Sequence, residues 1–112
     1  MAAGKYNIII DQGSDYTLGL TLVTSGIAND LTGYFVRGQI RVKKTSASIT
    51  ATFVAMIADA SLGTIAISLT NATTKALSPG LYYYDIEIYK AADALVIQIL
   101  QGTATVRAEV TR

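Results

Sequence analysis

Apolar and polar residues alternate with a period of two along most of this chain, and this alternation constrains the fold more than any motif does. In residues 16–22 every even position is apolar or aromatic, and every odd position is small or polar. Successive side chains of a strand point to opposite faces of a sheet, so such a segment is typical of a half-buried strand. The alternation recurs in residues 34–43, 49–57, 65–69, 81–88, 95–99 and 104–110. Seven or eight short strands with turns at intervals of about ten residues predict an all-β antiparallel sandwich.

One segment, residues 71–77, breaks the alternation. It begins with Asn71, a residue type that caps helix N-termini, and it stops at the sequence Ser78-Pro79-Gly80. It therefore predicts one helical turn that crosses from one sheet to the other. Tyr82 then stands where immunoglobulin-like sandwiches have a corner tyrosine, whose hydroxyl donates a hydrogen bond back to the preceding loop.

The chain of 112 residues shows no repeat, linker or low-complexity tail, so we expect a single domain over residues 1–112. Residues 1–5 are a candidate flexible arm that reaches a partner, as are residues 111–112, with frayed ends as the alternative. The first residues lack the apolar core of a signal peptide, and no apolar run is long enough to cross a bilayer. We therefore expect synthesis in the cytoplasm and no membrane partner.

The amino-acid composition excludes several kinds of chemistry. The chain has no Cys, which excludes disulfides, thiolate nucleophiles and sulfur-bound zinc. It has no His, which excludes Ser-His-Asp catalysis and the common transition-metal sites. The formal net charge of +1 argues against nucleic-acid binding. Four neighbouring basic residues are more typical of the solvated face of a strand; they are Arg37, Arg41, Lys43 and Lys44.

Asp11 and Asp15 flank a glycine directly after an apolar run, in the sequence IIIDQGSDYTL. An EF-hand loop beginning at Asp11 needs Gly at its sixth position and Glu at its twelfth, but Tyr16 and Leu22 stand there. A retroviral-type aspartic protease needs Thr or Ser after its aspartate, but Gln12 follows. We therefore predict a turn between two strands, with a surface calcium ion held by Asp11 and Asp15 as the alternative.

The outward positions of the predicted strands carry several aromatic and charged side chains. Asp85 and Glu87 share one face of a strand, as general acid-base pairs do, but we favour solvated residues that pair with Arg37 or Arg41 across the sheet. Tyr83 is a candidate contact residue, because aromatic rings are enriched at protein interfaces. The interface candidates are Tyr83, Arg37, Arg41, Asp85, Glu87, Arg107 and Glu109. We predict no catalytic residue and no cofactor.

Five blocks of sequence, read in order, carry a resemblance to a known family. They are IDQGSDYTLGLTL, NDLTGYFVRGQIR, ATFVAMIADASLGTIAISLT, ALSPGLYYYDIEI and LQGTATVRAEVTR. Together they resemble a family of small virion proteins from tailed bacteriophages and prophages, and the layout is similar to the N-terminal module of phage upper-baseplate proteins. The resemblance implies an immunoglobulin-like β-sandwich built into the virion. The chain departs from the pattern at Ala108, where proline is common, which leaves the path of the terminal strand open.

We therefore expect a virion structural protein, made in the host cytoplasm, that serves as an adaptor in the tail, baseplate or fibre-attachment region without being an enzyme. Its partners would be other phage structural proteins and copies of itself, bound by packing and strand pairing, with no nucleic acid and no small-molecule substrate. Small outward residues favour flat faces for such packing; they are Thr50, Thr52, Thr64, Ser68, Thr103 and Thr105. The alternatives are a capsid decoration protein that bridges coat subunits and a carbohydrate-binding β-sandwich with Tyr83 in its platform. A hydrolase that uses Asp11 is a further alternative.

Overall fold

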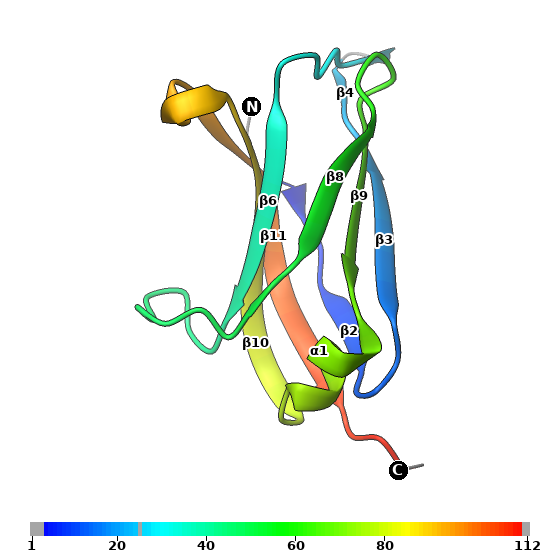
Figure 1. The fold of residues 1–112 in the computed structure, drawn as a ribbon, viewed down its shortest axis with the longest axis vertical. Helices are drawn as coiled ribbons and strands as arrows, with labels where there is room; N and C mark the ends of the chain where they lie inside the picture. The colour runs from blue at the N-terminus through cyan, green and yellow to red at the C-terminus, as the bar shows by residue number, and fades with distance from the viewer. Residues whose placement is uncertain (1–3, 25, 111–112) are drawn as a thin grey trace.

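The computed structural model describes residues 4–24 and 26–110, which form two β-sheets packed face to face (Figure 1). The first sheet has the order β1 (Gly4–Lys5), β11 (Val96–Arg107), β10 (Gly80–Tyr89), β6 (Phe35–Arg41) and β7 (Ala51–Thr52), and β2 (Ile8–Asp11) also pairs with β11. The second sheet has the order β3 (Tyr16–Thr21), β9 (Thr64–Leu69) and β8 (Val54–Asp59). The remaining elements are the ribbon of β4 (Val23–Thr24) and β5 (Ile27–Ala28), the helix α1 (Asn71–Ala76) and the 3-10 helix η1 (Ala91–Asp93).

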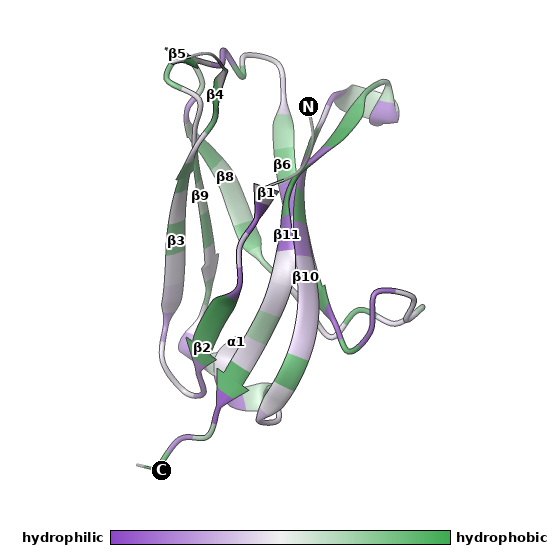
Figure 2. Cartoon of the chain, turned by 180° about the vertical axis from the view of Figure 1, so that it is seen from behind, coloured by the Kyte–Doolittle hydropathy of each residue, from purple (hydrophilic) through white to green (hydrophobic). Residues whose placement is uncertain are grey.

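The prediction of an all-β, immunoglobulin-like sandwich with one short helical crossover is confirmed. Within the described residues, seven strands are at least four residues long. The sheets are not purely antiparallel, however, because β1 and β2 pair parallel with β11. The turn after β2 carries the chain to the second sheet, so β2 does not form a hairpin with β3 and lies beside β11 instead (Figure 2). Alternation indicates which face of a strand is buried, but it does not indicate which strand lies next to it.

The core lies between the sheets and consists mainly of side chains at the inward positions that the alternation predicts. Strand β9 buries Ile65, Ile67 and Leu69, and strand β10 buries Tyr82, Tyr84, Ile86 and Ile88. Burying one such side chain fully stabilises the fold by about 1.5–3 kcal/mol. These two strands therefore hold the sheets together.

Strand β11 unites two segments that the sequence pattern separated. Ile86 of β10 lies opposite Leu100. The next residue, Glu87, lies opposite Gln98, so Ile99 is an extra residue in a β-bulge. One extra residue reverses the side to which every later side chain points, so the inward positions change from odd to even numbers along β11.

The chain passes from the first sheet to the second at Phe53, between β7 and β8. Strand β7 pairs with β6, whereas β8 pairs with β9. The backbone N–H of Phe53 donates a hydrogen bond of 2.9 Å to the carbonyl of Gly38, and the buried Phe53 ring meets that of Tyr84 edge-on. A strand that switches sheets in this way closes one corner of a sandwich.

The helical turn and the corner tyrosine are both confirmed. Helix α1 is capped by Thr70 rather than by Asn71, which had been predicted as the cap; Asn71 lies in the first turn. The Tyr82 hydroxyl donates a hydrogen bond of 2.6 Å to the backbone oxygen of Ser78. This bond ties the loop after α1 to the beginning of β10.

The ends of the chain differ from the prediction. Gly4 and Lys5, expected in a flexible arm, form β1 on β11, while residues 1–3 and 111–112 lie outside the described residues. The last strand ends at Arg107 rather than at residue 110, because the partners of β11 end there: β2 stops at Asp11 and β10 starts at Gly80. Ala108 and Val110 therefore lie outside any strand and are exposed. Three apolar residues elsewhere also lie outside the strands predicted for them and are exposed; they are Val42, Ile49 and Leu95.

Candidate functional site

The segment of residues 11–15 joins β2 to β3, and the prediction of a turn is confirmed. The backbone N–H of Ser14 donates a hydrogen bond of 3.1 Å to the carbonyl of Asp11, and Gly13 has a φ of +83°, which favours glycine. The Asp11 carboxylate accepts a hydrogen bond of 2.7 Å from Nε of Arg107 on β11. This hydrogen bond lowers the pKa of the exposed Asp11 carboxyl.

The same turn is fastened to α1. The Asp15 carboxylate accepts hydrogen bonds from the backbone N–H of Asn71 at 2.7 Å and from its side-chain amide at 3.0 Å. The buried Thr74 hydroxyl accepts a hydrogen bond of 3.1 Å from the N–H of Gly13 and donates one of 2.8 Å to the carbonyl of Ser14. Asp11 and Asp15 thus contact different elements and join β2, β3, α1 and β11. Within the described part of the chain, no three acidic side chains cluster in a way that could hold a metal ion.

The outer face of the first sheet carries five of the seven predicted interface residues: Tyr83, Arg37, Arg41, Asp85 and Glu87. Arg37 of β6 forms the predicted ion pair with Glu87, its neighbour across the ladder to β10. The Arg37 guanidinium also lies 4.3 Å from the centroid of the Tyr89 ring. The hydrogen bond to Glu87 raises the pKa of Arg37. Water reaches both partners, so this pair contributes little to stability.

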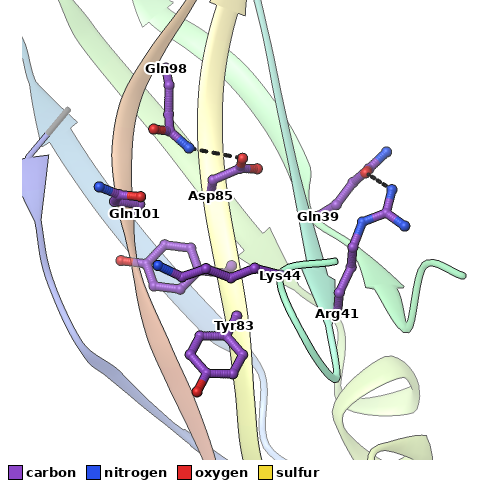
Figure 3. Close-up of a pocket in the computed structure, with 8 residues that line it drawn as sticks. Gln39, Arg41, Lys44, Tyr83, Asp85, Gln98 and Gln101 are labelled. Atoms are coloured by element: carbon purple, nitrogen blue, oxygen red, sulfur yellow. Dashed lines mark hydrogen bonds between the residues drawn. The ribbon is translucent and has the colours of Figure 1, made fainter. Parts of the chain in front are cut away.

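A pocket of about 250 Å³ opens on the same outer face, over β6, β10 and β11 (Figure 3). It is lined by Gln39, Arg41, Lys44, Tyr83, Tyr84, Asp85, Gln98 and Gln101. Strand register explains part of this set, because Asp85 lies opposite Gln39 of β6 and Gln101 of β11. The bulge at Ile99 adds Gln98, because it lets Gln98 and Gln101, which differ in parity, point to the same side.

Hydrogen bonds hold several of these side chains in place. The Asp85 carboxylate accepts one of 3.0 Å from Nε2 of Gln98, and does not pair with an arginine in the described residues. Arg41 donates one of 2.9 Å to Oε1 of Gln39 and one of 2.8 Å to a backbone oxygen in the loop after β6. Lys44 lies in that loop, with its ammonium 5.9 Å from the centroid of the Tyr83 ring.

The sequence predicted only part of this pocket. Tyr83, Arg41 and Asp85 were candidates for their type and outward position, but the three glutamines and Lys44 were missed as site residues. Outward amides are ordinary in a strand, and only the register across three strands brings them together. If the pairing of β10 with β6 and β11 is known, counting residues from Asp85 identifies the three glutamines; Lys44 lies in a loop and gave no such signal.

The other two interface candidates lie at the end of the sandwich that contains the β2–β3 turn and α1 (Figure 1). Arg107 pairs with Asp11, as described above. The backbone N–H of Glu109 donates a hydrogen bond of 3.0 Å to Oε1 of Gln12, whose amide donates one of 3.0 Å to the carbonyl of Leu77. Arg107 and Glu109 therefore fasten the end of the chain and do not join the face of Tyr83.

The outer face of the second sheet has a different character, because the one charged side chain on its described rows is Asp59, at the end of β8. Two of its rows run Thr17, Ser68, Val54 and Gly19, Ala66, Met56 and carry no charge, and the third runs Thr21, Thr64, Asp59. Val54 and Met56 are 59% and 60% exposed. The sequence had indicated Thr64 and Ser68 as small residues of a flat face, and the structure adds the two large apolar side chains beside them.

The edges of the second sheet are also open. Strands β3 and β8 are its edges, each is six residues long, and neither pairs with a further strand in the described residues. Proteins usually protect exposed edges with short strands, prolines or charges. The edges of the first sheet follow this rule, because β1 and β7 have two residues each and β2 has four. In the second sheet, β3 contains no proline or charge, and β8 has only the terminal Asp59.

Comparisons with known proteins bear on the fold. A scan against models of known families gives no match, and a search of curated proteins gives none. Among solved structures the chain resembles part of InlP from Listeria monocytogenes, with a TM-score of 0.52 and 20% sequence identity. The match covers 94% of this chain and 27% of the InlP chain, so this chain spans about a quarter of that protein. A likeness at this identity shows the sandwich fold alone. No helix in the described residues is long and apolar enough to span a membrane.

Proposed function

We propose that this chain is a structural protein of a bacteriophage virion, an adaptor in the tail, baseplate or fibre-attachment region that acts without catalysis. The resemblance of its five sequence blocks to small proteins of tailed phages supports the place in a virion. The mode of action is carried by one observation: the second sheet combines two uncharged outer rows, which contain Val54 and Met56, with two unprotected edges. We call this face and its edges the docking sheet.

The docking sheet is suited to two kinds of contact. The two rows that contain Val54 and Met56 can pack on a neighbouring protein at little cost of desolvation, since they have no charges to strip of water and these two side chains supply apolar area. Its edges present unpaired backbone N–H and C=O groups that can accept a strand from a neighbour. The partners are other virion proteins or a second copy of the chain.

Purified phage particles from the host that encodes the chain test the place in a virion. We expect mass spectrometry to find peptides of this chain in the particles, and gold-labelled antibody to mark the tail end in negative-stain images. Label on the head would contradict the adaptor role and assign the chain to capsid decoration. Absence of the chain from intact particles would contradict any virion role.

A further inference from the structure

The pocket on the outer face of the first sheet has the dimensions of a small polar ligand. Its volume is about 250 Å³. One water molecule occupies about 30 Å³ of the liquid, so the pocket holds roughly eight waters, or a compact molecule of about a dozen non-hydrogen atoms. Drug-sized ligands generally occupy pockets of about 300–1,000 Å³. A single sugar ring with its substituents fits this size.

The outward tyrosine of the pocket, Tyr83, offers a platform for such a ring. Tyr83 points outward from β10 and is half-buried, with one side of its ring approached by the flexible Lys44 side chain. The face of an aromatic ring carries partial negative charge. The C–H groups on one face of a pyranose carry partial positive charge, so a sugar ring stacks on such a surface.

The polar side chains around Tyr83 match sugar hydroxyls. Oε1 of Gln39 and Nε2 of Gln98 are engaged inside the protein, by Arg41 and Asp85 respectively. This leaves the Gln39 amide N–H groups as donors, and the Gln98 carbonyl and second Asp85 oxygen as acceptors. Gln101, which lies opposite Asp85 on β11, adds another amide. Hydrogen-bond donors and acceptors thus both lie around Tyr83, and the hydroxyl groups of a sugar can use both.

The charges of the pocket favour an acidic sugar. Arg41 and Lys44 are cationic, and Asp85 is the one anionic group in the lining. The two hydrogen bonds from Arg41 fix its guanidinium, whereas Lys44 stands on an exposed loop and is free to turn toward a ligand carboxylate. We propose that this pocket binds a single acidic sugar residue, with its ring on Tyr83 and its carboxylate at Lys44. The proposal is independent of the virion role, because the pocket lies on the sheet opposite the docking sheet.

The test is a titration of the isotopically labelled whole chain, followed by amide resonances in NMR spectra. The probes are the sodium salts of glucuronate, galacturonate and N-acetylneuraminate, with glucose as the neutral control and acetate as the anion control. We expect at least one acidic sugar to shift the amides of Tyr83, Asp85 and Gln98, more tightly than glucose by up to about fivefold. No shift with any acidic sugar would overturn the proposal. So would glucose binding as tightly as the acidic sugars, or acetate reproducing their shifts.

Matched variants test whether stacking on the Tyr83 ring accounts for binding, rather than a general loss of structure. Tyr83→Ala should weaken binding by about tenfold or more, whereas Tyr83→Phe should keep it, because the ring is what stacks. Tyr89→Ala is the control: Tyr89 lies on the same face of the same strand but outside the pocket lining. Lys44→Gln should remove the preference for acidic over neutral sugars and keep the stacking. Unchanged binding by Tyr83→Ala, with a native spectrum, would overturn the assignment of the pocket.

Discussion

The two sheets of this sandwich have similar inward faces and different outward ones. The first sheet carries an ion pair, three amides and a polar pocket on its outer face, and its edges are strands of two to four residues. The second sheet presents threonines, small residues and two exposed apolar side chains, and its edges are strands of six residues without a partner in the described residues.

This difference shows that the residues that stabilise the fold are distinct from the residues that are available to partners. Burial between the sheets needs only the inward residues, so it places no demand on either outer face. An isolated domain gains from charges on both outer faces and from protected edges, because they suppress association. The first sheet follows that rule and the second does not. The asymmetry is the physical basis for assigning docking to one sheet and ligand binding to the other.

The largest expected effect comes from placing a charge on the docking sheet. Met56→Lys should weaken incorporation into particles by about 2 kcal/mol or more, roughly thirtyfold, because the interface would bury an unpaired charge. The matched control is Leu81→Lys, since Leu81 is 55% exposed on the outer face of the first sheet. Competition of each variant with the natural chain during assembly measures the effect. Normal incorporation of Met56→Lys together with failure of Leu81→Lys would reverse the assignment of the faces.

The second-largest effect is expected from a substitution at Gly102 that exposes the edge of the first sheet now covered by β1. A Cβ at Gly102 would overlap the backbone oxygen of Tyr6, which also accepts a hydrogen bond of 2.6 Å from the Tyr84 hydroxyl. Gly102→Val should therefore push β1 away from β11, lower the free energy of unfolding by about 1–3 kcal/mol and promote self-association. Urea unfolding and light scattering measure the two effects.

The control for this change lies in the other sheet. A Cβ at Gly19 of β3 would meet no atom within 4 Å, so Gly19→Val should fold at least as stably as the natural chain. Equal destabilisation by the two changes would contradict the overlap at Gly102 as its cause, and Gly102→Val without self-association would contradict protection of the edge by the N-terminal strand.

A smaller effect concerns the polar face. Glu87→Gln removes the ion pair with Arg37 and should lower the melting temperature slightly at low ionic strength, with the difference fading as salt rises. Ser68→Ala, in an uncharged row of the second sheet, should show no such salt dependence. Differential scanning calorimetry at low and high salt compares them. A salt-independent effect of Glu87→Gln would mean that packing, and not charge, is what the pair supplies.

The smallest effect is the pH dependence of Asp11, whose folded pKa lies below its ordinary value of 3.8 because Arg107 stabilises the carboxylate. The folded state then binds fewer protons than the unfolded state in this range, so the contribution is present above pH 3.8 and is lost as the pH falls through the folded pKa. The difference in unfolding free energy between the natural chain and Asp11→Asn should shrink on acidification. A constant difference from neutral to acidic pH would contradict the pairing.

The sequence predicted those parts of the structure that depend on local pattern. Alternation identified inward residues such as Ile67 and Ile86, and the Gly-Leu-Tyr motif identified the corner bond of Tyr82. The pair of Arg37 and Glu87 was also predictable, because outward charges of opposite sign on neighbouring strands attract.

The rest depends on contacts between distant parts of the chain. The parallel pairing of β2 with β11 joins residues nearly a hundred positions apart, which no local pattern specifies. The bulge at Ile99 depends on register with β10, so the sequence alone divided β11 into two strands. The pocket was missed for the same reason, because Gln98 and Gln101 share a face only through that bulge. Thr74 gave no signal either, since a threonine in a short helix is ordinary.

The most direct test of the docking sheet is a cryo-microscopy map of the assembly that contains this chain. We expect a neighbouring protein against Val54 and Met56 or along the backbone of β3 or β8, with Tyr83 and its pocket facing solvent. A map in which the face of Tyr83 is covered, and the outer face and both edges of the second sheet are in water, would contradict the account.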